Sequence, residues 1–191
     1  MLKPLLLTLA LAATLPAAAA AELRVAIAGR PDLVLDLPEG WRYQLTRSGA
    51  DATQSLLLES PKAGDFRVQI VASASAPGTK PPTATAIAAE LRHRVQAEAD
   101  AEAPKASEPK LSLFDLDASG KSGYFFSATE KSPGAEGYEN LTQGALGLDE
   151  LRIDFTIWSH GDPKAATDAA LQMLRSVRRA PAATVGGKAS G

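Results

Sequence analysis

The chain has 191 residues, 45% of them hydrophobic, and its 20 Lys and Arg against 22 Asp and Glu give a formal net charge of −2. A charge so close to neutral, with no long run of like charge, excludes a general attraction to nucleic acid or to anionic lipid. The sequence contains no cysteine, which excludes disulfides, thiolate catalysis, cysteine-based zinc sites and an acylated N-terminal cysteine.

The first 21 residues have the three-part pattern of a secretory signal peptide. Lys3 supplies a basic start, residues 5–15 form an apolar run, and Pro16 precedes small residues that end at Ala21 and fit an A-x-A cleavage site. The apolar run is shorter than the ~20 residues of a membrane span, and no later stretch is long enough either. We therefore predict a signal peptide over residues 1–21 and a mature chain without a membrane span. We expect this chain to be exported to the periplasm, with secretion as the alternative.

Alternating apolar and polar residues predict five short strands after the signal peptide, at residues 23–28, 33–37, 41–46, 55–60 and 66–75. Turns rich in Pro and Gly separate them. Strands joined by short turns pair antiparallel, so this part of the chain is predicted to be a meander.

The period then changes from two to about four residues, which predicts an amphipathic helix over residues 83–101. Ile87, Leu91 and Val95 form its apolar stripe, and Thr83 or Thr85 can cap its N-terminus. A loop rich in Pro, Lys and Glu follows over residues 102–110.

The second half predicts four more strands and a second helix. The strands cover residues 111–116, 123–130, 140–148 and 151–158. Asp162 can cap the helix, with Pro163 at its first position. The residues expected along its apolar stripe are Ala166, Ala170, Met173, Leu174 and Val177, and those expected in its last turn are Arg175, Arg178 and Arg179.

Residues 22–179 are therefore predicted to form one α+β domain, with a mainly antiparallel sheet and helices packed on it in layers. Residues 180–191 have no periodicity and are predicted to be a disordered tail.

Two stretches resemble the PsbP-like superfamily: "LVLDLPEGW" at residues 33–41, and "LQMLRSV" at residues 171–177, where a last helix ends. The order of the elements between them is also similar. The resemblance spans about residues 33–179 and implies a layered α/β/α sandwich. It also implies an extrinsic or periplasmic accessory protein, a class that usually lacks a catalytic centre. No functional residue of the family can be matched to a position in this chain.

The stretch "FDLDASGKSGYFF" (residues 114–126) is similar to two ligand-binding motifs. Asp115 and Asp117 stand where a calcium loop begins, but Phe126 occupies the position of its bidentate Glu. Residues 120–122, "GKS", imitate the end of a phosphate loop, but Asp115 replaces the first Gly of that motif. A polar connection between two strands accounts for the whole stretch, so a β-hairpin is predicted.

The stretch "WSHGD" places Ser159, His160 and Asp162 together and suggests a catalytic triad. Adjacent side chains at a strand end point apart, however, and Asp162 is better used as a helix cap. The only other histidine, His93, lies on the polar face predicted for the first helix, so the two do not have the spacing of a metal site. No catalytic residue, metal or cofactor is predicted.

Trp41 and Trp158 are the candidate binding residues, because an exposed Trp often contributes much of the affinity for a partner. The sequence thus predicts an exported, non-enzymatic binding or accessory protein. It engages a protein partner or a small apolar ligand through its sheet face or a helix–sheet groove. Two alternatives stay open: a hydrolase that uses His160 with a nearby carboxylate, and a calcium-binding protein that uses Asp115 and Asp117.

Overall fold

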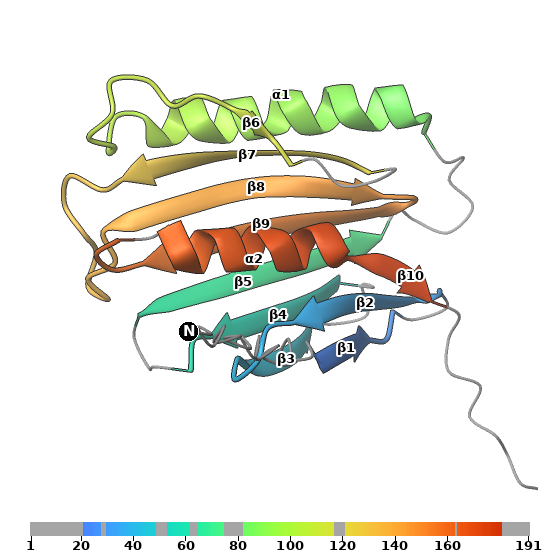
Figure 1. The fold of residues 1–191 in the computed structure, drawn as a ribbon. Helices are drawn as coiled ribbons and strands as arrows, with labels where there is room; N and C mark the ends of the chain where they lie inside the picture. The colour runs from blue at the N-terminus through green and yellow to red at the C-terminus, as the bar shows by residue number, and fades with distance from the viewer. Residues whose placement is uncertain are drawn as a thin grey trace, which may run out of the picture.

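A computed structural model describes residues 21–27, 30–48, 53–61, 65–74, 82–116, 121–162 and 164–180 (Figure 1). The predicted signal peptide, apart from Ala21, lies outside these residues. So do Asp117, Pro163 and the predicted tail from residue 181 onward.

Seven strands form one antiparallel sheet, in the order β3-β4-β5-β9-β8-β7-β6. The bounds are β3 Arg42–Ser48, β4 Thr53–Glu59, β5 Phe66–Ala74, β6 Phe114–Asp115, β7 Ser122–Thr129, β8 Asn140–Leu148 and β9 Leu151–Ser159. The alternation predicted for β9 is confirmed, because Leu151, Ile153, Phe155 and Ile157 are all buried on one face.

Three further strands form a second antiparallel sheet, in the order β1-β2-β10. They are β1 Ala21–Val25, β2 Asp32–Leu37 and β10 Arg178–Ala180. The first two strands had been expected to join the meander. Instead their apolar side chains pack against the large sheet and the second helix in one core.

The two helices belong to different layers. α1 (Ala84–Glu102) packs on β7 and β8 over a core of its own, and α2 (Lys164–Ser176) packs with β2 and β9 over the main core. Thr83 caps α1, as predicted, because its side chain accepts a hydrogen bond from the N–H of Ala86 at 3.2 Å. The predicted α+β class and the layered packing are confirmed (Figure 1). Neither helix is long and apolar enough, within the described residues, to cross a membrane.

The C-terminal boundary of α2 differs from the prediction. The helix ends at Ser176, and Arg178 and Arg179 lie in β10 rather than in a last helical turn. The backbone of Arg178 pairs with Val34 of β2, and its side chain forms ion pairs with Glu22 and Asp36, both at 2.7 Å. Strand pairing and these carboxylates therefore replace the helix-dipole contact that had been expected.

Candidate functional site

A groove runs along one flank of α1, where the start of the helix meets the end of β5 and the turn between β8 and β9. A cavity of about 250 Å³ lies there, and an adjoining hollow of about 460 Å³ shares five of its residues. We call the two together the α1 groove. Its lining residues are Ser73, Ala74, Pro82, Ala84, Ile87, Glu90, Leu91, Ser122, Gly147, Asp149, Glu150, Leu151 and Arg152.

Gly147 allows the helix to approach the sheet at the floor of this groove. A Cβ atom at position 147 would lie 2.5 Å from Cγ2 of Ile87 and 3.2 Å from Cδ1 of Leu91. Ile87 and Leu91 are one helical turn apart and therefore face β8 together, as their spacing in the sequence predicted. The floor is thus formed by apolar side chains and by a glycine backbone.

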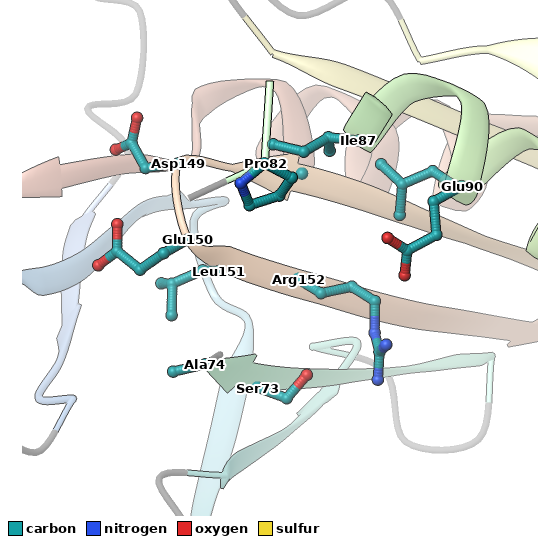
Figure 2. A pocket seen from close by; sticks show the side chains of 11 residues that line it. Ser73, Ala74, Pro82, Ile87, Glu90, Asp149, Glu150, Leu151 and Arg152 are labelled. Atoms are coloured by element: carbon teal, nitrogen blue, oxygen red, sulfur yellow. The ribbon is translucent and has the colours of Figure 1, made fainter. Parts of the chain in front are cut away.

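The turn between β8 and β9 supplies the acidic end of the groove. Leu148 pairs with Leu151, so Asp149 and Glu150 form a two-residue connection. Asp149 has a φ of 53°, the left-handed conformation, which Asp and Asn adopt more readily than most other residues. Figure 2 shows Asp149 and Glu150 near one end of the cavity and Glu90 and Arg152 toward the other.

Some of the charges around the groove are neutralised by ion pairs. Glu150 pairs with Arg30 at 2.9 Å and with Arg179 at 3.4 Å. Its pKa lies below the usual value, because its carboxylate accepts a hydrogen bond from its own backbone N–H and lies beside these two guanidinium groups. Arg152 pairs with Asp154 at 3.1 Å.

Two acidic side chains of the groove are not neutralised. The carboxylates of Glu90 and Asp149 have no hydrogen bond or ion pair with any residue in the described part of the chain. The α1 groove therefore combines an apolar floor with an excess of negative charge.

A network of polar contacts fixes α1 beside the groove. Arg94 of the helix pairs with Asp154 of β9 at 3.4 Å and with Glu98 at 3.1 Å. Glu98 also accepts a hydrogen bond from the side chain of Gln143 at 3.1 Å. Arg94 and Glu98 are not part of the apolar stripe predicted for the helix, and only the packing of the helix on the sheet reveals the groups that they meet.

The two tryptophans and His160 lie at one end of the large sheet. Trp41 is half-buried, with its ring 4.6 Å from that of Phe66, and it lines a hollow of about 400 Å³ together with His160. Trp158 is half-buried against the α1 core and lines a separate hollow of about 350 Å³ together with Tyr138. The Tyr138 and His160 rings stack at 4.5 Å, a contact that the sequence did not predict.

Ser159, His160 and Asp162 do not form a triad. The imidazole of His160 is stacked on Tyr138 and has no hydrogen bond to a described residue. Ser159 is 2% exposed, and Asp162 accepts a hydrogen bond from the N–H of Lys164 at 3.0 Å, as a cap of α2 does. The arrangement lacks the nucleophile–base contact that acyl transfer requires.

The two strands of the predicted hairpin pair as expected, β6 with β7, and the connection at residues 117–120 lies outside the described residues. The predicted strand at 111–116 is shorter than expected, because only Phe114 and Asp115 pair. Asp115 is exposed, and its expected partner Asp117 lies outside the described residues. Within the described ranges, no three His, Cys, Asp or Glu residues gather as a metal site would require.

Lys121, the lysine of the "GKS" sequence, has a structural contact that sequence reasoning missed. Its ammonium group donates hydrogen bonds to the backbone carbonyl of Arg175 at 2.9 Å and to that of Val177. These carbonyls lie at the C-terminal end of α2, where intrahelical donors are lacking. Burial lowers the pKa of Lys121, and the nearby charge of Arg178 adds to this effect. Lys121 thus caps a helix instead of facing a phosphate.

Among known proteins, a similarity to this chain is found only at the level of solved structures. No protein-family model and no curated protein matches the sequence. Among solved structures, the chain is similar to the solution structure of cyanobacterial PsbP (CyanoP) from Synechocystis sp. PCC 6803. The TM-score is 0.49 and the identity 12%, over 88% of this chain and 98% of that chain. No functional residue of that protein is transferred to this chain.

Proposed function

We propose that this protein is exported and acts as a non-enzymatic binding or accessory protein, which engages a protein partner through the α1 groove. The observation that carries the proposal is the composition of the groove. Its floor is apolar and open, and the basic side chain that lines it, Arg152, is already paired with Asp154.

A binding site and an active site place their polar groups differently. An active site brings a nucleophile or an acid–base pair within hydrogen-bond reach at one point of a concave pocket. In the α1 groove the carboxylates of Glu90 and Asp149 instead lie toward opposite ends of the cavity (Figure 2). Apolar contact with a few orienting polar groups is the pattern of a recognition site.

Trp158 is proposed as a further contact on the same face as α1. It lies at the other end of the helix from the groove, and its hollow is lined by Tyr138, Lys105 and Glu130. A half-buried Trp beside a Tyr offers apolar area with polar edges, which is common at interfaces. Trp41 packs on the opposite face against Phe66, and we propose it as a contact of secondary importance.

The experiment fills the groove with a side chain and measures the capture of partners. Ser73 lines the groove from β5, and Ser55, a half-buried serine on neighbouring β4, does not line it. Immobilised mature chain is incubated with periplasmic extract, and the retained proteins are identified by mass spectrometry. A partner retained by the wild type and by Ser55→Tyr should be lost with Ser73→Tyr.

His160→Ala serves as the test of the hydrolase alternative in the same assay. We expect this variant to fold and to retain the partner, because the imidazole of His160 stacks on Tyr138 and forms no hydrogen bond with a described residue. Partner binding that survives Ser73→Tyr would contradict the proposed role of the groove. A hydrolytic activity of the wild type that His160→Ala abolishes would instead favour the enzyme.

A further inference from the structure

We propose that the α1 groove recognises a short extended segment of its protein partner in which a Lys or Arg side chain follows an apolar one. This inference rests on the proposed function and specifies the chemistry of the partner. The argument has three parts: the size of the cavity, the charge at its rim, and the pairing of the cations nearby.

The groove is made of two hollows of different size. The hollow of about 250 Å³ lies below the ~300–1,000 Å³ typical of pockets that enclose a whole small ligand and suits one or two side chains, and the adjoining hollow of about 460 Å³ lies within that range and leaves room for the rest of a segment. Ile87, Leu91 and Leu151 provide apolar surface, and Leu91 and Leu151 are buried within the core. An aliphatic side chain of an extended peptide can therefore cover Ile87 and remove it from water.

The rim favours a cation. Glu90 and Asp149 have no cationic partner among the described residues, whereas Glu150 is shared by Arg30 and Arg179. A basic side chain beside the apolar anchor could reach one of these two carboxylates, which have no partner among the described residues. An acidic segment would meet two like charges instead, and such repulsion is a common source of specificity.

The nearby cations do not reverse this preference. Arg152 is paired with Asp154, and Arg94 is shared between Asp154 and Glu98. The contact of Arg152 with Asp154 uses its Nε atom, and the Asp154 carboxylate offsets the charge of Arg152 at this end of the groove.

Arg30 and Arg179 share the single carboxylate of Glu150, so the carboxylates around the groove outnumber the guanidinium groups only through Glu90 and Asp149. This excess favours a basic segment over an acidic one.

The test measures the fluorescence anisotropy of labelled peptides with the mature chain. The basic probe is acetyl-Ser-Leu-Lys-Leu-Ser-amide, and two further probes carry Glu or Gln in place of Lys. We expect the Glu peptide to bind at least about tenfold more weakly than the Lys peptide at low salt, and the difference to shrink in 0.5 M salt as screening increases.

Variants of the chain identify the groups responsible. Glu90→Gln combined with Asp149→Asn should weaken the Lys peptide about tenfold and leave the Gln peptide unchanged. Asn is chosen because it tolerates the left-handed backbone of position 149 as well as Asp does. The control combines Glu39→Gln with Asp115→Asn, two exposed carboxylates outside the groove, which changes the net charge by the same amount.

The outcomes separate this inference from the proposed function. If all three peptides bind equally and Ser73→Tyr abolishes their binding, the groove is a binding site but the charge preference is wrong. If the Lys peptide binds equally to Ser73→Tyr, or if none of the peptides binds, the inference is overturned. Sedimentation that shows groove-dependent self-association, lost in Ser73→Tyr, would identify a second copy as the occupant and would also overturn it.

Discussion

At the scale of single residues, the short motifs of this chain have local structural roles. The lysine of "GKS" caps α2, Asp162 caps the other end of the same helix, and Asp115 belongs to a hairpin strand. Each of these residues matches part of a ligand-binding or catalytic pattern. The geometry distinguishes the two roles, because a capping side chain is directed at backbone groups and is not available to a ligand.

Lys121→Met should therefore destabilise the fold. The substitution keeps much of the apolar stem but leaves the carbonyls of Arg175 and Val177 without their donor. An unsatisfied, partly buried group of this kind costs about 1–3 kcal/mol, to be measured by urea denaturation. Lys131→Met is the matched control: Lys131 bonds the carbonyl of Pro104 at an exposed site, so its loss should cost less than about 0.5 kcal/mol. Equal losses in the two variants would contradict the capping role.

Glu130 provides a prediction about pH. Burial raises its pKa above the usual value, and the neighbouring carboxyl of Glu102 raises it further. A raised carboxyl pKa means that the folded state binds a proton more tightly than the unfolded state. The protonated carboxyl of Glu130 therefore stabilises the folded state fully at a pH below the pKa that Glu130 has in the unfolded chain. This contribution is lost as the pH rises through the higher pKa that Glu130 has in the folded state.

Glu130→Gln should remove this pH dependence. We expect the variant to gain stability over the wild type as the pH rises from acidic toward neutral, measured by thermal unfolding across that range. Glu136→Gln is the control, because the Glu136 carboxylate is exposed and bonded to Arg67 at 2.8 Å. A wild type and a Glu130→Gln variant whose stabilities change in parallel with pH would show that the raised pKa has no effect on folding.

At the scale of elements, the sequence predicted what depends on local periodicity. The bounds expected for β8 agree with the structure, those for β9 and α1 agree within a residue, and Met173, Leu174 and Val177 are buried as expected. The separate sheet β1-β2-β10 could not be predicted, because its strands come from opposite ends of the chain. For the same reason Glu90 and Asp149 were not recognised as residues of one groove, because the groove forms only when α1 packs on β8.

The packing of α2 supports a comparison of two core substitutions. Leu174 is fully buried under the large sheet, whereas Trp41 is half-buried and packs mainly on Phe66. Leu174→Ala should cost about 2–5 kcal/mol, a large part of a typical stability of ~5–15 kcal/mol. Trp41→Ala should cost less than the ~3–5 kcal/mol of a fully buried aromatic residue. Chemical denaturation measures both, and a cost for Trp41→Ala above that for Leu174→Ala would contradict this assignment of the core.

At the scale of the whole molecule, the two ends of the described chain meet in the small sheet. Arg178 of β10 pairs with Glu22 of β1 and with Asp36 of β2, and each distance is 2.7 Å. Leu23, Val25 and Ile27 are buried in the main core behind these exposed ion pairs. Exposed pairs contribute little on their own, so the apolar side chains supply most of the stabilisation from β1.

The position of signal cleavage should therefore matter to the entire fold. Cleavage after Ala21 removes one exposed strand residue and retains every buried side chain of β1, so a chain that starts at Glu22 should be as stable as one that starts at Ala21. A chain that starts at Arg30 loses Leu23, Val25 and Ile27. Each fully buried aliphatic side chain contributes about 1.5–3 kcal/mol, so the free energy lost in this deletion approaches the stability of a whole domain.

Intact mass of the exported protein checks the cleavage site, and urea denaturation of the three chains checks its consequence. An exported protein that retains Met1, or a chain from Arg30 that unfolds at the same urea concentration as the chain from Glu22, would contradict this account.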